Sequence, residues 1–487
     1  MSDLLSIGRT GLMASKKSLE TTGHNIANAN TEGYSRQRVV QTTGSPIIKE
    51  GFITGTGARV NGTKRFEAPL LEKRLKSSIS NNQFHKEKAT QLERVENIFS
   101  EVNGESLNQV LGNFFNSFRE LSNHPENDSI KSIVRDNADF VIKDFSRITG
   151  DLENISRGID SKIGTEIENI NQNLKEIAKL NTQITKAEAS GDQSGDMLDQ
   201  RDLALRTLSE SFQVTAYVDG KNRFVVNAEG VGTLVSAGQV QELAVAGNSK
   251  EKASNNMAGG VEVVFKNRPL SNITHRFQKG RVASLLDTRN KDIGALKNSI
   301  DDIAYNFARE VNYIHRQGVV DRPVEVNQNG DMIKEDYKGK TTGIDFFAGL
   351  TNRDNAATKL QLHSLIKEDT SNISTGLTPN AAGDNRIALD ISKLQYKKLL
   401  NGGTATFEEQ YLKSISNLGV KSGKAQLNSE QSEGLLSQAQ SLKEKITGVS
   451  IDEEAANMIR FQHAYQASAK VLQSADEMFD TVLAIKR

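Results

Sequence analysis

"EEAANMIRFQHAYQASAKVLQSADEMFDTVL", residues Glu453–Leu483, carries the most regular apolar repeat in the chain. Large side chains recur at every seventh position through this stretch and just before it, at Ile451, Met458, Tyr465, Leu472 and Phe479. A seven-residue apolar repeat is typical of a helix that pairs with another helix. Acidic residues in the first turn and basic residues at the chain end also suit the helix dipole. We therefore predict a terminal helix from residue 451 that needs a partner.

A matching stripe occupies the other end of the chain. Residues 3–28 place Leu5, Leu12, Leu19 and Ile26 at the same seven-residue spacing. The positions three further on hold the small residues Gly8, Ser15 and Thr22. This pattern predicts a narrow helix that approaches its neighbour closely but buries little surface by itself. The two ends of the chain therefore carry matched apolar stripes.

"NIANANTEGYSR", residues Asn25–Arg36, follows the first helix directly. Asn and Gly end helices readily and adopt backbone conformations that other residues resist. We predict that this segment joins the terminal coil to the body of the protein. The expected contacts for assembly are the large residues of both stripes together with Asn28, Asn30, Gly33, Tyr34 and Arg36. Of these, Tyr34 and Arg36 are the expected anchors on the far side of the bend.

Between the termini, the pattern predicts an α+β fold that is mainly α. The clearest seam is Ile163, Ile170, Ile177 and Ile184, which indicates a long antiparallel bundle or coiled coil. Alternating residues after Gln213, with an Asp-Gly turn, predict β-strands instead. The expected domains are a terminal coiled-coil domain (1–35 and 450–487), a helical bundle of discontinuous segments (36–212, 281–316 and 395–449), an inserted β-rich outer domain (213–280) and a second polar or β insertion (317–394).

The composition excludes several classes of protein. Lys plus Arg and Asp plus Glu number 61 each, so bulk positive charge cannot drive nucleic-acid binding. The chain has no Cys, which removes disulfides and thiolate metal sites. We expect no membrane insertion, because no apolar stretch approaches 18 residues. The N-terminus lacks the pattern of a cleaved secretory signal, so export would use another route.

Each candidate motif for catalysis or cofactor binding departs from the pattern that the chemistry requires. "GTGARVNG" (Gly55–Gly62) has Val60 where a dinucleotide loop needs its third Gly, and "GKTTG" (Gly339–Gly343) has Lys334 at the first Gly of a phosphate loop. The His residues form no zinc pattern. "EVNQNGDMIKED" (Glu325–Asp336) is a degenerate calcium loop, for which a solvated turn is the favoured interpretation. We therefore predict no catalytic residues, no cofactor and no metal site.

Both ends of the chain resemble the flagellar axial proteins, the rod, hook and hook-associated families. The N-terminal resemblance lies in Asn25–Asn28 and Asn30–Arg36, which are similar to the family signature A-N-x-N-T-x-G-Y-S-R. At the C-terminus, Glu453–Leu483 is similar to the paired terminal helix of these families. "MLDQRDLALRTLS" (Met197–Ser209), "NYIHRQG" (Asn312–Gly318) and "DFF" (Asp345–Phe347) resemble internal motifs of the hook-associated proteins.

The resemblance implies a structural subunit at the junction of hook and filament, with no enzymatic activity. It further implies a ring of identical subunits whose terminal coils line an export channel, with hook protein and hook-associated protein 3 as neighbours. Export unfolded through the flagellar type III apparatus is implied, with a chaperone on the C-terminal helix and an extracellular location. Hook protein and hook-associated protein 3 stay open as alternative identities, and a peptidoglycan hydrolase is disfavoured because no catalytic carboxylate pair can be singled out.

The terminal stripes are too thin to fold alone. Burying one large apolar side chain contributes about 1.5–3 kcal/mol, whereas ordering the backbone costs about 1–2 kcal/mol per residue. Some thirty residues with four or five such anchors come out unfavourable. We expect both termini to be disordered in the free monomer and to fold in the assembly.

Overall fold

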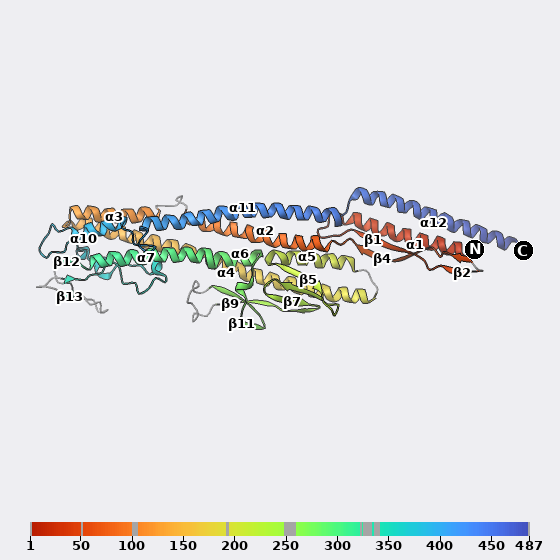
Figure 1. Cartoon of the computed structure of the whole chain (residues 1–487), viewed down its shortest axis with the longest axis horizontal. Helices are drawn as coiled ribbons and strands as arrows, with labels where there is room; N and C mark the ends of the chain where they lie inside the picture. Colours follow the sequence, from red (N-terminus) through yellow and green to blue (C-terminus); the bar gives the residue numbers. More distant parts are fainter. Residues whose placement is uncertain are drawn as a thin grey trace.

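The computed structural model describes residues 2–49, 52–99, 106–190, 194–247, 260–321, 324, 334–335 and 341–485. The molecule is strongly elongated, and its two termini lie together at one end (Figure 1). Long helices run along the molecular axis, and small antiparallel sheets are attached at the sides (Figure 1). The predicted class, α+β and mainly α with β-rich insertions, is confirmed.

Helices make up most of the chain. The α-helices are α1 (Ser2–Ala27), α2 (Pro69–Glu96), α3 (Leu107–Asn123), α4 (Asp128–Ser190), α5 (Gly195–Ser211), α6 (Gly280–Asp287), α7 (Gly294–His315), α8 (Ala356–Lys359), α9 (Ser364–Glu368), α10 (Arg386–Lys393), α11 (Phe407–Thr447) and α12 (Ile451–Ile485). A π-helical turn, Thr288–Ile293, connects α6 to α7. The terminal helices and the long central helices therefore occur where the heptad patterns predict them.

The strands form five small antiparallel sheets in the described residues. Near the N-terminus, β1 (Gln37–Thr43) pairs with β4 (Ala58–Arg65), and β2 (Ile47–Lys49) pairs with β3 (Phe52–Thr54). The largest sheet has the order β5-β6-β7-β8, with bounds Val214–Val218, Phe224–Ala228, Gly232–Ser236 and Gln239–Val240. The fourth sheet consists of β9 (Leu243–Gly247), β10 (Val261–Phe265) and β11 (Arg268–Asn272), with β10 in the middle. The last sheet joins β12 (Val319–Val320), β14 (Thr341–Thr342) and β13 (Lys334–Glu335).

The 63-residue helix α4 is the spine of the bundle. Its predicted seam residues Ile163, Ile170, Ile177 and Ile184 are all buried. The helix packs against α3 near one end and against α5 near the other, and the sheet strands β7 and β9 also rest on it. Asn171 fixes one of these strands, because its side chain donates to Leu243 O at 2.8 Å and accepts from Leu243 N at 2.9 Å.

Residues 341–394 differ from the predicted outer insertion. Phe346 and Phe347 are fully buried, and the Phe346 ring lies 5.9 Å from that of Phe114. Helix α10 packs on α3, and α8 packs on α7 and α4. The segment has a polar average, but most of its large apolar side chains enter the main core. The degenerate calcium loop 325–336 lies outside the described residues except for its two-residue strand β13.

Helix α11 begins later than predicted and has two apolar faces. It starts at Phe407, because a capping box of Thr406 and Glu409 sets the first turn. Leu399 and Leu400 therefore precede the helix, and Leu400 forms an isolated bridge with Ala405. The buried positions Tyr411, Leu418, Ala425, Ser432 and Ala439 recur every seven residues, and the helix packs along α2. Leu435, Leu442 and Ile446 also have helical spacing in the sequence, but they are exposed and lie on a second stripe of α11.

His315 is a completely buried histidine at the end of α7. Its Nδ1 donates to Ile344 O at 2.8 Å, and its Nε2 accepts from Ser374 N at 3.1 Å. If the ring were protonated, Nε2 would carry a hydrogen that faces the N–H of Ser374, so two donors would meet. Burial lowers the pKa of His315 to about 4, although the Ile344 carbonyl and Asp345 oppose this shift.

The position of His315 predicts a loss of stability in mild acid. Because the folded-state pKa lies below the unfolded value of about 6.5, its contribution is complete above pH 6.5 and disappears as the pH falls toward 4. We expect a loss of about 2 kcal/mol between pH 7 and pH 5. Denaturant unfolding at both pH values should show a smaller loss for His315→Gln. The matched change at exposed His275 should behave like the wild type, and equal losses in all three proteins would contradict this assignment.

Candidate functional site: the joint of the terminal helices

Helices α1 and α12 lie side by side and contact one another along their length (Figure 1). The face of α1 that is buried consists of small and short polar residues: Gly8, Ala14, Ser15, Ser18, Thr21, Thr22 and Asn25. A Cβ atom at Gly8 would lie 3.2 Å from Leu472 Cγ, and one at Gly11 would lie 2.9 Å from Ser468 Oγ. The close approach predicted from the small residues is therefore present.

The large stripe residues are only partly covered in this single chain. Those of intermediate exposure are Leu5, Leu12, Leu19 and Ile26 of α1 and Met458, Tyr465 and Leu472 of α12. Ile451 and Phe479 are exposed, and so is Asn30 in the bend. The role of these residues as contacts between subunits stays a prediction.

The β1–β4 ribbon covers another side of α1. Gln41 on β1 donates through Nε2 to Ser18 Oγ at 2.9 Å. Gly57, which precedes β4, has a φ of +94°, and a Cβ there would meet Thr10 Oγ1 at 2.2 Å. We expected residues 36–65 to belong to the bundle, but the ribbon packs mainly on α1. Helices α1 and α12 and the β1–β4 ribbon therefore pack together, and we call these three elements the terminal unit.

Asn25 is the polar centre of the joint. Its side chain is almost fully buried, and every hydrogen-bonding position is used. Oδ1 accepts from Tyr34 Oη at 2.8 Å and from Gln37 N at 2.9 Å. Nδ2 donates to Gln37 O at 2.9 Å and to Glu454 Oε2 at 3.0 Å. One side chain therefore ties the end of α1 to the returning chain and to α12.

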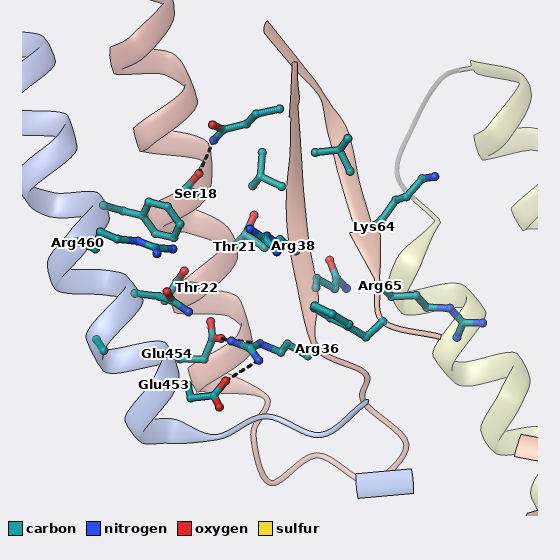
Figure 2. A pocket seen from close by; sticks show the side chains of 18 residues that line it. Ser18, Thr21, Thr22, Arg36, Arg38, Lys64, Arg65, Glu453, Glu454 and Arg460 are labelled. Carbon is teal, nitrogen blue, oxygen red and sulfur yellow. Dashed lines mark hydrogen bonds and ion pairs between the residues drawn. The ribbon is translucent and has the colours of Figure 1, made fainter. Parts of the chain in front are cut away.

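Arg36 connects the bend to the start of α12. Its guanidinium donates to Glu454 Oε1 at 2.8 Å and to Glu453 Oε2 at 2.7 Å, as the dashed lines in Figure 2 show. Its backbone N–H donates at 2.9 Å to the carbonyl oxygen of Thr447, the last residue of α11. Paired charges near a helix start also suit the dipole of α12. The bend, α11 and α12 thus meet at one residue.

Tyr34 packs beside Asn25 and stays protonated. Its hydroxyl also contacts His24 Nδ1 at 3.0 Å, and the two rings meet edge to face. Burial raises the pKa of Tyr34 above its usual range, and the nearby carboxylates of Asp196, Asp199 and Glu454 raise it further. Gly33, just before it, adopts a φ of +85° beside Leu203, so the turn requires a residue that tolerates the left-handed region.

A second charged cluster ties the bend to α5. The Ser35 N–H donates to Asp199 Oδ2 at 3.0 Å, and Arg65 Nη1 lies 2.9 Å from Asp199 Oδ1 and 2.8 Å from Asp202 Oδ2. Burial raises the pKa of Asp199, whereas the hydrogen bonds from Ser35 and the charge of Arg65 oppose that shift. Asp199 and Asp202 belong to the "LDQRD" motif. This motif therefore positions the bend on the bundle.

The polar groups of the joint bond to one another, so the arrangement can hold segments of the chain in place. Asn25, Arg36 and Asp199 all bond to other groups of the protein, and no cluster of three metal-ligating side chains occurs among the described residues. No helix in that same part of the chain has the length and apolarity to cross a membrane. Tyr34 and Arg36 make these contacts within one chain, and their predicted role in assembly stays a prediction. The sequence did not identify Asn25, Arg65 or Asp199 as members of the site, nor Glu454 as their partner.

The terminal helices are paired, and a polar joint holds them to a long bundle. This arrangement agrees with the class of flagellar axial subunits that the terminal motifs resemble. Comparison with known families agrees at three places. Residues 92–332 match the family described as flagellar hook-associated protein FlgK helical domain. Residues 445–485 match the flagellar basal body rod FlgEFG protein C-terminal family, and residues 5–34 match the flagella basal body rod protein family.

Full-length relatives give the particular family. The chain is 28% identical to flagellar hook-associated protein 1 of Bacillus subtilis, over 98% of this chain and 97% of the relative. It is 23% identical to the protein of the same name from Escherichia coli, over the whole of both chains. The fold is similar to that of the flagellar hook junction protein FlgK from Burkholderia pseudomallei, with a TM-score of 0.62, 14% identity, and coverage of 77% of this chain and 100% of that one. The chain belongs to the flagellar hook-associated protein 1 family and is a structural protein of the bacterial flagellum.

Proposed function

We propose that this chain forms the junction between the hook and the filament, as an extracellular subunit that works only when packed among copies of itself. The full-length relatives carry the name hook-associated protein 1, and the structural relative is described as a hook junction protein. A junction subunit needs surfaces for neighbours of two kinds. The long helix α11 supplies the observation that carries the proposal.

Helix α11 presents a continuous apolar stripe to solvent. The stripe consists of Leu412, Val420, Leu427, Leu435, Leu442 and Ile446, and Val420 and Leu427 are each 68% exposed. It spans 34 residues, or about 50 Å of helix at 1.5 Å per residue. Its members are spaced for one helix face, while the opposite face packs on α2. Large apolar patches on a soluble protein mark interaction sites, so this stripe favours a subunit that is covered in its assembly.

The proposed architecture follows the helix layout. Residues 1–35 and 450–487 form the terminal coiled-coil domain, joined by the ribbon that packs on α1, and this unit lines the channel. The helices of 69–212, 281–316 and 407–449 form the surrounding shell. The sheets of 213–280 face outward. The buried part of residues 317–394 forms the end of the shell that lies opposite the chain termini.

The proposed neighbours are hook protein on one side and hook-associated protein 3 on the other. Before assembly, the chain leaves the cell through the flagellar type III apparatus, and a chaperone covers the C-terminal helix. The half-covered Met458, Tyr465 and Leu472 and the exposed Phe479 support the need for such a cover. Disorder of both termini in the free monomer stays a prediction.

Deletion of the gene tests the proposed function. We expect cells that keep their hooks, lack filaments and shed filament subunits into the medium, because the filament has no surface on which to begin. Electron microscopy of the cells and gel analysis of the medium would measure both effects. Restoration by the wild-type gene is the control. Normal filaments on the deletion strain would refute the proposal, and loss of hooks as well would favour hook protein instead.

A further inference from the structure

A groove lies between the terminal helices and the β1–β4 ribbon, and the joint closes one end of it (Figure 2). Its volume is about 890 Å³. Residues of α1, α12, β1 and β4 line it, including the apolar side chains of Val39, Val40 and Phe461. The groove belongs to the terminal unit and is not filled by any described segment of this chain.

The groove has an excess of positive charge. Arg460 extends from α12 toward the ribbon, and Arg38 extends from β1 toward the helices (Figure 2). The acidic lining residues Glu453 and Glu454 are both engaged by Arg36. Neither Arg38 nor Arg460 forms an ion pair with any described residue. Two cations therefore face an open groove without an ion-pair partner among the residues that the structure describes.

The ribbon adds to this imbalance. Lys64 on β4 lies directly opposite Arg38 on β1 in the antiparallel register. Like charges directly opposite one another destabilise a strand pair. A carboxylate bound in the groove would relieve this repulsion as well as pair with Arg38. The groove is therefore suited to an acidic segment that also carries apolar side chains.

Such a segment exists near the end of α12. Asp476 and Asp480 lie one turn apart on one face of the helix, about 6 Å from each other, and Glu477 is adjacent. All three are exposed, and none forms an ion pair with a described residue. Met478 and Phe479, between them, are also exposed, at 49% and 46%. We call residues 476–480 the acidic turn.

We propose that the groove of one subunit binds the acidic turn of a second copy of this chain. The inference rests on the proposed function, since it requires stacked subunits. A subunit cannot fill its own groove, because Arg460 and Phe479 are 19 residues apart on one helix, or about 28 Å. Two parallel copies displaced along the helix axis by that distance bring the turn onto Arg38 and Arg460.

Cysteine cross-linking tests the proposal directly. The chain has no Cys, so only introduced residues can react. In the variant with Val39→Cys and Phe479→Cys, each copy carries one cysteine in its groove and one in its acidic turn. Oxidation of isolated hook junctions should therefore link neighbouring copies into dimers and longer chains. The two sites are too far apart for a bond within one chain, because a disulfide needs Cα atoms within about 7 Å. Each single variant and the pair Val39→Cys with Gln473→Cys should give at least about tenfold less product.

Charge exchange tests the same contact by function. Arg38→Glu with Arg460→Glu should reduce the number of filamented cells at least about tenfold, and Asp476→Lys with Asp480→Lys should do the same. The four changes combined should restore filaments, because opposite charges again face one another. Equal amounts of each variant in isolated junctions or in the medium would show that folding and export are intact.

The outcomes separate the possible failures. Normal filaments after gene deletion would overturn the proposed function itself. Loss of filaments on deletion, with no cross-link from the Val39 and Phe479 pair and no rescue by charge exchange, would overturn only the assignment of the groove. A groove variant that loses filaments and is restored by charge reversal in hook protein would assign the groove to that neighbour and would also refute the proposal.

Discussion

Replacing Glu454 by lysine should leave cells with hooks but almost without filaments. The Glu454 side chain is 3% exposed, accepts from Arg36 at 2.8 Å and accepts from Asn25 at 3.0 Å. Lysine would place a cation against Arg36 and remove one of the two acceptors of the Asn25 amide. Breaking a buried charge pair in this way costs about 3–5 kcal/mol. Because the bend, α1 and α12 all meet at this carboxylate, the terminal unit would lose its position on the bundle.

The neighbouring carboxylate supplies the matched control. Glu453 also pairs with Arg36, at 2.7 Å, but its side chain is 62% exposed. Exposed ion pairs contribute about 0–1 kcal/mol, so Glu453→Lys should retain most filaments. Counting filamented cells, together with the amount of each variant in the medium, would compare the two. Equal defects would show that burial of Glu454 is not the cause. Partial recovery on adding Arg36→Glu to Glu454→Lys is also expected.

Gly280→Ala should lower the free energy of unfolding by more than about 2 kcal/mol, because both the backbone conformation and the packing oppose a side chain. Gly280 begins α6 with a φ of +79°. A Cβ there would lie 2.5 Å from Phe212 N and from the carbonyl group of Ser211. These are backbone atoms of the segment that leaves α5, so they cannot move aside as a flexible side chain would.

An exposed glycine in a helix gives the opposite expectation. Gly158 lies in α4, and a Cβ added there would have no neighbouring atom within 4 Å. Gly158→Ala should therefore stabilise the protein by up to about 1 kcal/mol, since alanine loses less backbone entropy in a helix. Urea unfolding followed by circular dichroism in the far ultraviolet would measure both variants. A Gly280→Ala midpoint equal to that of the wild type would contradict the clash.

Sequence periodicity predicted the long helices well and the exposure of their faces less well. The isoleucines of the α4 seam repeat every seven residues and are buried, because a helix in the middle of a bundle has neighbours along its whole length. Helix α11 has apolar residues on two faces, and the period does not say which face the bundle covers. In the region 317–394, the polar average concealed Phe346 and Phe347, which are fully buried.

In the joint, too, the local sequence indicates some features and not others. The bend is visible in the sequence because Asn and Gly at the end of a helical stripe are local signals. Its partners are not local, since Asp199 is 164 residues from Ser35 and Glu454 is 418 residues from Arg36. An acidic residue in the first turn of α12 is explained by the helix dipole alone, so nothing in its sequence position indicated a buried partner.

The sequence by itself determined that the chain is mainly helical, that its two ends form matched helices, and that a bend separates the first helix from the rest. These properties depend on side-chain period and backbone preference, which act over a few residues. Only the tertiary structure decided that Gly8 and Gly11 of α1 face α12, that Asn25 and Glu454 close the joint, and that Arg38 and Arg460 share an open groove. Those outcomes depend on which distant segments meet, and that is set by the packing of the whole chain.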